Sequence, residues 1–276
     1  MFYDTSPYCE KLAPVREDRC LAIVVLNPYE SRRLIAKGVL ALPEVKRALE
    51  SHLFVVSRGT TCAYLVDELT GETLEKGLST AGIVTDGRLA STVESLRLGP
   101  WVFRNGKLSK EPAPEALNSF GPCDVSVKGV NAVDPEGNVG VIASNNLGGT
   151  IGAIWPILSA RGSYLIIPVG LEKLIPSVKV ATHKTGQGVH KYVMGSRISL
   201  MSVMNAIVVT EKESLEMLTG ATVTLIASGG VAGSEGAVIL SIEGSEGTVM
   251  KAVDLVQSIK GEPPFSLPPL EPPVWE

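Results

Sequence analysis

Short apolar runs alternate with amphipathic stretches over about the first 180 residues of the chain. A run rich in β-branched and aromatic residues predicts a buried strand, whereas apolar residues spaced three or four apart predict one face of a helix. Strands are predicted at 20–26, 54–56, 81–84, 124–134, 139–142 and 163–169. Helices are predicted at 27–40, 43–51, 60–69 and from the Gly-rich segment 145–152 to about 161. Asn27 is expected to cap the first helix with Pro28 as its first residue, and residues 101–108 are expected to form a hairpin that turns at Asn105–Gly106.

This alternation predicts an α/β protein with a mostly parallel, Rossmann-like sheet flanked by helices over residues 20–180, after an irregular segment, 1–19. A polar, Gly-containing segment at 181–204 then forms a linker or a lid. Residues 205–261 contain two hairpinned strands and two helices, the pattern of a small ferredoxin-like (split βαβ) subdomain. The Pro-rich tail, 262–276, is expected to be extended. It packs across this protein or another subunit, which would make a homo-oligomer, or it is a mobile terminus.

Charge and composition narrow the classes of partner. The 276 residues carry a net charge of −4 and the pI is about 5.6, so no basic excess is available for a nucleic-acid backbone or an anionic lipid surface. No stretch reaches the ~18 apolar residues of a membrane span. The first residues lack a leader pattern, and the four cysteines include no CxxC pair. We therefore expect a cytoplasmic protein with free thiols, no nucleic-acid or membrane partner, no metal and no cofactor.

The stretch Phe54–Gly71 carries the clearest candidate binding motif. An apolar strand ends at a short polar turn and a helix follows; Gly59 allows close backbone approach, and Thr60 and Thr61 are candidates to cap the helix. The free N–H groups at a helix start form a natural anion site, and Arg58 is placed to grip a phosphate or carboxylate there. The alternatives are an ordinary βα turn without a ligand and a surface salt bridge of Arg58.

Two further polar turns are predicted at the same edge of the sheet, because the carboxyl ends of parallel strands face the ligand crevice. The first holds Asn131, Asp134 and Glu136. Asp134 is a candidate general base or hydrogen-bonds a ligand hydroxyl, although Asp before Pro135 is also typical of a plain turn. The second is a glycine-lined helix start that would close the opposite wall, unless it is only a capped helix. Its candidate residues are Asn145, Asn146, Gly148, Gly149 and Thr150.

Positive charge is concentrated in the Gly-containing segment that begins at residue 181. Such a loop folds over an anionic ligand as a lid, or it is a solvated linker. Its candidate ligand-binding residues are His183, Lys184, His190 and Lys191. Cys62, at the predicted helix start, is either a reactive thiol or a small buried packing residue, and we favour the second interpretation.

Three short motifs carry a resemblance to known proteins. Residues 56–65 (Val-Ser-Arg-Gly-Thr-Thr-Cys-Ala-Tyr-Leu) form a strand, turn and helix start, 129–134 read Gly-Val-Asn-Ala-Val-Asp, and 147–150 read Leu-Gly-Gly-Thr. In this order they resemble the G-T-G-S-T turn, the G-A-D-E-I/V-D segment and the K-G-G-G-A segment of ribose-5-phosphate isomerase type A. The fold of that family is shared with glucosamine-6-phosphate deaminase and the CoA transferases. The resemblance covers roughly residues 52–260 in outline and implies a sugar-phosphate site at the first turn.

The same positions depart from the groups that support proton transfer in the isomerases. The resemblance implies Asp, Lys and Glu, but this chain has Asn131, then Asn146 and Leu147, then the apolar segment Ile154–Ile157. Neutral amides and apolar side chains do not remove a proton from a sugar carbon at pH 7, so ribose-phosphate isomerisation is not carried over. The CoA transferases use a Glu nucleophile, for which Glu136 is a candidate; a solvated turn carboxylate is the alternative.

Two functions remain open at this stage. In the first, the protein binds a small phosphorylated or carboxylated metabolite at a crevice formed by 58–61, 131–134 and 146–150. Any catalysis there would be aldose-ketose isomerisation or acyl transfer, because no complete dinucleotide fingerprint is present. In the second, it is a non-catalytic binding or regulatory module whose small subdomain and tail mediate assembly. Asn131 and the missing Lys favour the second, whereas convergence of Arg58, Asp134 and the 183–191 loop on one pocket would favour the first.

Overall fold

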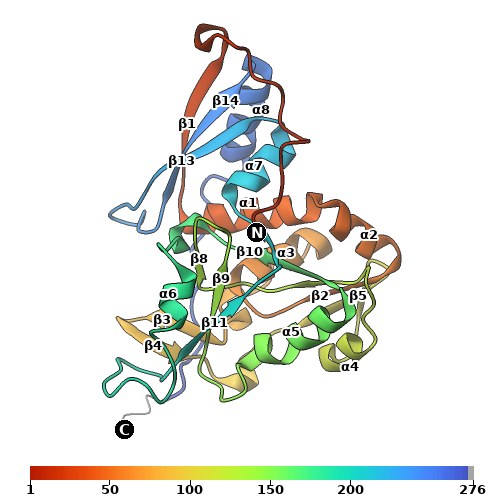
Figure 1. The fold of residues 1–276 in the computed structure, drawn as a ribbon, viewed down its shortest axis with the longest axis vertical. Coiled ribbons are helices and arrows are strands. Elements are labelled where there is room, and N and C mark those ends of the chain that lie inside the picture. The colour runs from red at the N-terminus through yellow and green to blue at the C-terminus, as the bar shows by residue number, and fades with distance from the viewer. Residues whose placement is uncertain (273–276) are drawn as a thin grey trace.

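A six-stranded sheet forms the centre of the computed structural model, which describes residues 1–272 (Figure 1). The strands follow the order β12-β10-β7-β2-β5-β6. The first four pair in parallel, whereas β5 pairs antiparallel with both β2 and β6. Their bounds are β12 (Ile207–Val209), β10 (Tyr164–Pro168), β7 (Val125–Val127), β2 (Leu53–Val56), β5 (Trp101–Arg104) and β6 (Lys107–Ser109). This confirms a mixed α/β protein, and the β5–β6 pair confirms the hairpin predicted at Asn105–Gly106.

Helices cover both faces of this sheet, because successive strand residues point to opposite sides. Phe54 and Val56 pack with α1 (Pro28–Ala41), α2 (Pro43–Ser51) and α3 (Thr60–Thr70), while Leu53 and Val55 pack with α4 (Ala113–Asn118) and α5 (Gly149–Arg161). The start of α1 is as predicted: Asn27 accepts hydrogen bonds from the N–H groups of the first turn, and Pro28 is the first helical residue.

A second sheet lies beside the first and contains β11 (Ser199–Val203), β9 (Val139–Ala143) and β8 (Ala132–Val133) in antiparallel order. The single strand predicted at 124–134 is therefore wrong. The chain leaves the main sheet after Val127, crosses at Lys128–Asn131 and enters the second sheet at Ala132. A separate hairpin of β3 (Gly82–Thr85) and β4 (Arg88–Ser91) and the short helix α6 (Val178–Thr182) lie near this second sheet (Figure 1).

A third sheet, at the top of Figure 1, has the order β1-β14-β13 and is antiparallel throughout. Its elements are β1 (Cys20–Leu26), β13 (Thr222–Ser228), β14 (Val238–Gly244), α7 (Glu211–Thr219) and α8 (Glu246–Ser258). The sequence pattern predicts a buried strand at 20–26 within the larger sheet, but β1 pairs with β14. Leu21, Ile23 and Val25 are exposed and only the alternate side chains face the core, as in a strand with one solvated face.

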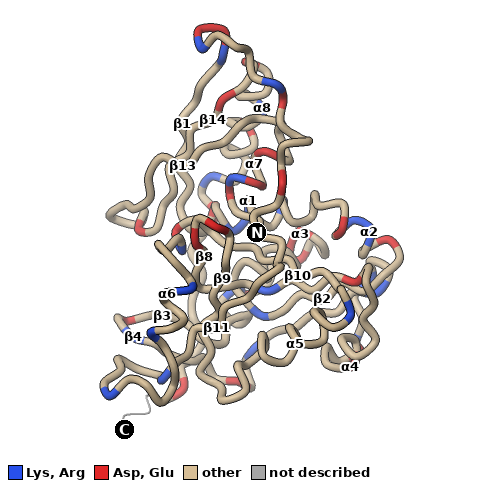
Figure 2. The backbone as a smooth tube through the Cα atoms, viewed as in Figure 1, with Lys and Arg blue, Asp and Glu red and all other residues tan. Residues whose placement is uncertain are grey.

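Helix α1 joins the two parts of the molecule, since it follows β1 of the upper sheet and packs on both α3 and α7. The approach to α7 requires a glycine: a Cβ on Gly38 would lie 2.2 Å from the Ser214 hydroxyl. Lysine, arginine and acidic positions are interspersed in both parts (Figure 2). Within residues 1–272, no helix is both long and apolar enough to cross a bilayer.

The Pro-rich tail packs on the protein's own surface as far as the structure describes it. The Val93 N–H donates to the Pro269 carbonyl at 3.1 Å, and the Glu271 N–H donates to the Ser91 carbonyl at 2.8 Å. Phe265 packs edge-on against Tyr29 of α1, with ring centroids 5.6 Å apart. Residues 273–276 of the predicted tail lie outside the described part of the chain.

Candidate functional site

Charged residues gather where the parallel strands end. Lys128 follows β7 directly, Glu172 and Lys173 lie in the turn after β10, and Glu211 opens α7 just after β12. Parallel strands end at one edge of a sheet, and in α/β proteins this edge is where ligands bind. The β2–α3 turn, with Arg58 and Gly59, ends at the same edge.

Cys62 lies near the two lysines of this group. It belongs to the first turn of α3, is fully buried, and its sulfur faces the backbone N–H of Gly129. Burial raises the pKa of the Cys62 thiol, while the nearby charges of Lys128 and Lys173 act in the opposite direction. The residue thus matches the favoured interpretation, a buried packing thiol, and it shows that both lysines lie close to the amino end of α3.

Lys128 and Lys173 form no direct ion pair among the described residues. The Nζ atom of Lys128 donates to the Gly129 carbonyl at 2.8 Å, and that of Lys173 donates to the Val130 carbonyl at 3.2 Å. Within the described residues, neither ammonium group lies within 4.0 Å of a carboxylate. Burial lowers the pKa of both lysines, and the charge of Lys173 lowers that of Lys128 further. These two partly buried lysines thus bond neighbouring backbone carbonyls, and neither forms a direct ion pair among the described residues.

Two carboxylates, Glu172 and Glu211, lie beside Lys173. Glu211 is completely buried; its Oε2 accepts the Leu171 N–H at 2.9 Å. Burial, followed by the charge of Glu172, raises the pKa of Glu211 to about 8. The Ser31 hydroxyl lies near this carboxylate but outside hydrogen-bond geometry. Buried polar atoms normally have partners, yet four here have none: Glu211 Oε1, Glu172 Oε2, Ser31 Oγ and Arg32 Nε.

The β2–α3 turn has the predicted position but not the predicted cap. Helix α3 starts at Thr60, its N-cap is Gly59 with φ of 153°, and no side chain caps it, so the capping role of Thr60 and Thr61 is wrong. Thr60 and Thr61 are already the first and second helical residues, so neither occupies the cap position, which belongs to Gly59. Arg58 Nε donates to the Leu98 carbonyl at 3.2 Å; burial and the neighbouring Arg97 lower the Arg58 pKa. No side chain of the described residues therefore caps the amino end of α3.

The 131–136 turn uses its polar groups locally. Asn131 Oδ1 accepts the Ile142 N–H at 2.9 Å, and Glu136 contacts the Asn138 amide. Burial raises the pKa of Asp134, but its bonds from Val178, Asn138 and Glu136 outweigh this and lower it overall. The catalytic roles of Asp134 and Glu136 stay predictions, and the geometry is that of a carboxylate holding a turn.

The remaining predicted residues lie in two exposed loops. Asn146 and Thr150 are exposed around Gly148 and Gly149, where α5 begins without a side-chain cap. In the 183–191 loop, His183, Lys184 and Lys191 are exposed, and the His190 carbonyl accepts a hydrogen bond from Arg197 at 2.7 Å. Within the described residues, no hydrogen bond or ion pair joins either loop to Lys128 or Lys173. Arg58, Asp134 and this loop therefore do not converge through direct contacts.

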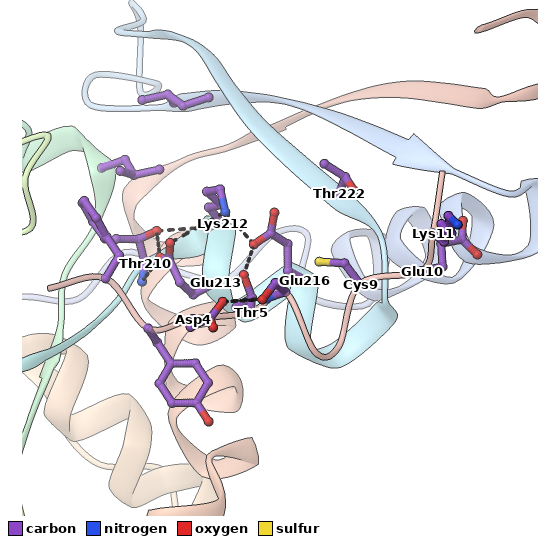
Figure 3. Close-up of a pocket in the computed structure, with 15 residues that line it drawn as sticks. Asp4, Thr5, Cys9, Glu10, Lys11, Thr210, Lys212, Glu213, Glu216 and Thr222 are labelled. Carbon is purple, nitrogen blue, oxygen red and sulfur yellow. Dashed lines mark hydrogen bonds and ion pairs between the residues drawn. The ribbon is translucent and has the colours of Figure 1, made fainter. Parts of the chain in front are cut away.

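A separate open groove of about 810 Å³ lies between the N-terminal segment and α7 (Figure 3). Its two buried carboxylates, Glu213 and Glu216, both accept hydrogen bonds. Glu216 accepts from Thr5 Oγ1 at 2.5 Å, from Lys212 Nζ at 2.6 Å and from the Val223 N–H at 3.0 Å. Glu213 accepts from the Thr210 hydroxyl and N–H, closing a capping box at the start of α7. These contacts stabilise the fold and commit the buried carboxylates of the groove to groups of the protein itself.

The sequence patterns do not predict four of these site residues: Lys128, Glu172, Lys173 and Glu211. A usable signal exists, because Lys128 directly follows the apolar strand Val125–Val127 and the Glu172–Lys173 pair follows the strand that ends at Pro168. Charged residues immediately after buried parallel strands lie at the ligand edge of the sheet.

Comparisons of the chain with protein-family models, with curated proteins and with solved structures gave no match.

Proposed function

We propose that this protein binds a small phosphorylated or carboxylated metabolite at the carboxyl edge of its parallel strands. The observation that carries the proposal is the pair Lys128 and Lys173, two partly buried cations beside Cys62 that form no direct ion pair among the described residues. Burying a charge without a partner is costly, and an anion between the two ammonium groups offsets that cost. The uncapped amino end of α3 adds N–H groups and a favourable dipole.

The finer fold assignment belongs to the same proposal. Four parallel strands with helices on both faces support a Rossmann-like arrangement, and the β1-β14-β13 sheet with α7 and α8 supports a ferredoxin-like subdomain. Together with the three turn motifs, they support a distant relation to the ribose-phosphate isomerase and CoA transferase fold. The site, rather than the fold, carries the functional argument.

An enzymatic role is supported by the carboxylate pair next to Lys173. A carboxyl group with its pKa raised near neutrality, as at Glu211, holds a proton at pH 7 and exchanges it readily, which suits a general acid or base. We therefore propose aldose-ketose isomerisation or acyl transfer as the reaction class. Asp134 and Asn131 favour the rival, a non-catalytic binding module, because both side chains serve local turns.

A thermal-shift screen with inorganic phosphate, sugar phosphates, CoA esters and simple carboxylates tests the binding proposal. An anion at 100 times its Kd stabilises by about 2.7 kcal/mol, which corresponds to a Tm rise of roughly 5 °C or more for a chain of this size. The double variant Lys128→Met/Lys173→Met should lose the shift, and the exposed Lys184→Met should keep it. Absence of a shift with every anion would contradict the proposal.

A further inference from the structure

We infer that Lys128 forms an imine with the carbonyl group of an anionic aldehyde or ketone, with Lys173 holding the anionic group and supplying the proton. The inference rests on the proposed anion site and names the chemical class of its ligand. It also gives the two lysines different roles, which the contacts of each residue distinguish.

The surroundings of Lys128 are those of a nucleophilic amine. Its charged and titratable neighbours are Cys62 and Lys173, with no carboxylate among them. Among the described residues its one hydrogen bond goes to the Gly129 carbonyl at 2.8 Å, so two of its three possible N–H groups are uncommitted there. Gly129 is open as well: a Cβ added there would have no atom within 4 Å, which leaves room for a ligand carbon. Burial and an adjacent cation are the two conditions that release a lysine proton.

Lys173 has the opposite surroundings. Burial lowers the pKa of Lys173 and the charge of Arg32 adds to this effect, but Glu172 and Glu211 both act to keep its proton. An ammonium group in this position attracts a phosphate or carboxylate and polarises a carbonyl oxygen. The two lysines therefore differ in their charged neighbours: carboxylates act on Lys173, and the cation Lys173 acts on Lys128.

The chemistry balances without an oxidant or reductant. The Lys128 nitrogen lone pair attacks the carbonyl carbon, and the proton that the amine loses goes to the carbonyl oxygen, giving a carbinolamine. A second proton from Lys173 then reaches the hydroxyl group, the C–O bond breaks, and water leaves as the C=N bond forms. The nitrogen keeps its remaining hydrogen, so the product is the protonated imine. Glu211 replaces the proton on Lys173, and hydrolysis of the imine returns all groups to their first state.

Pyridoxal 5′-phosphate, an anionic aldehyde, is a suitable probe of this site, with sodium borohydride added to reduce the imine and peptide mapping to find the label. We expect one pyridoxyl group per chain, on Lys128, formed at least about tenfold faster than on exposed Lys184 because more of its free amine is present at pH 7. Excess inorganic phosphate should slow it. Pyridoxal, which lacks the phosphate, should react at the same lysine but more slowly.

Variants separate the two roles. Lys128→Arg keeps the charge and much of the length but is not a nucleophile under these conditions, so it should lose the label while inorganic phosphate still raises its Tm. Lys173→Met should still be labelled at Lys128, but without a preference for pyridoxal 5′-phosphate over pyridoxal. Labelling spread equally over exposed lysines, together with a normal phosphate shift, would overturn the imine and leave the anion site standing. Absence of the phosphate shift in the wild type would overturn the anion site itself.

Discussion

The carboxyl edge of the parallel strands and the groove beside α7 both contain lysines and glutamates. The two regions differ in whether these side chains have hydrogen-bond and ion-pair partners. In the groove, Glu216 receives three hydrogen bonds and Lys212 is paired with it at 2.6 Å. At the sheet edge, Lys128 and Lys173 form no direct ion pair and two carboxylate oxygens have no donor among residues 1–272. Because native proteins satisfy most buried polar groups, the hollow with satisfied groups is structural and the unsatisfied cluster is where a ligand is expected.

The largest effect on stability is expected in the groove beside α7, where the buried carboxylates have hydrogen-bond partners. Glu216→Ala removes the acceptor of three donors, including the buried Val223 N–H, and should lower the free energy of unfolding by about 2–4 kcal/mol. Urea denaturation measures this loss. Lys212→Ala, which removes a more exposed partner, should cost less than about 1 kcal/mol. Equal costs would mean that the contacts of the groove are no more structural than an exposed ion pair.

A smaller change of opposite sign is expected at Glu211. Its pKa is raised in the folded protein, so the folded state binds more protons than the unfolded state between pH ~4.3 and about 8, and stability falls as pH rises through that window. Glu211→Gln removes this loss and should stabilise the protein by about 1–3 kcal/mol at pH 8, with little effect near pH 4.

Urea denaturation at several pH values gives this difference, with the exposed Glu136→Gln as the matched control. If the stability of the Glu211→Gln variant and of the wild type changed in parallel with pH, the pKa of Glu211 would not be raised by folding. That result would contradict the difference drawn here between the two regions.

The smallest effect on stability, and the sharpest on function, is expected for the lysine pair. Lys128→Met/Lys173→Met removes two partly buried unpaired cations and should raise stability by about 1 kcal/mol in anion-free buffer. Groups kept for a ligand cost stability when the ligand is absent. Chemical denaturation without phosphate or sulfate measures the change. A loss of several kcal/mol would assign the lysines to the structure instead.

Local sequence signals predict much of this fold. The Asn27–Pro28 helix start, the Asn105–Gly106 hairpin and the α7–β13–β14–α8 order all depend on contacts between near neighbours in the chain, which capping, turn and periodicity rules describe. The pairing of β1 with β14 was not predictable in this way, because it joins residues more than 200 positions apart. An edge strand with exposed Leu21, Ile23 and Val25 has the same apolar run as a buried one.

The candidate site shows the same limit. The β2–α3 turn is visible in the sequence, since one short stretch carries the strand, the glycine and the helix start. Lys128, Lys173 and Glu211 come from separate loops, and their meeting depends on the order β12-β10-β7-β2, which no local pattern contains. Sequence motifs instead favour Asp134 and Asn131, whose residue types match both a site and a turn, and the hydrogen bonds match the turn.

Calorimetric titration of the wild-type protein with inorganic phosphate at pH 7 tests the central claim most directly. Saturable binding at one site should be abolished in Lys128→Met/Lys173→Met and unchanged in Lys184→Met/Lys191→Met, which removes two exposed lysines of the predicted lid. Equal phosphate affinity in the two double variants, or loss of binding only in the second, would contradict an anion site at the ends of the parallel strands.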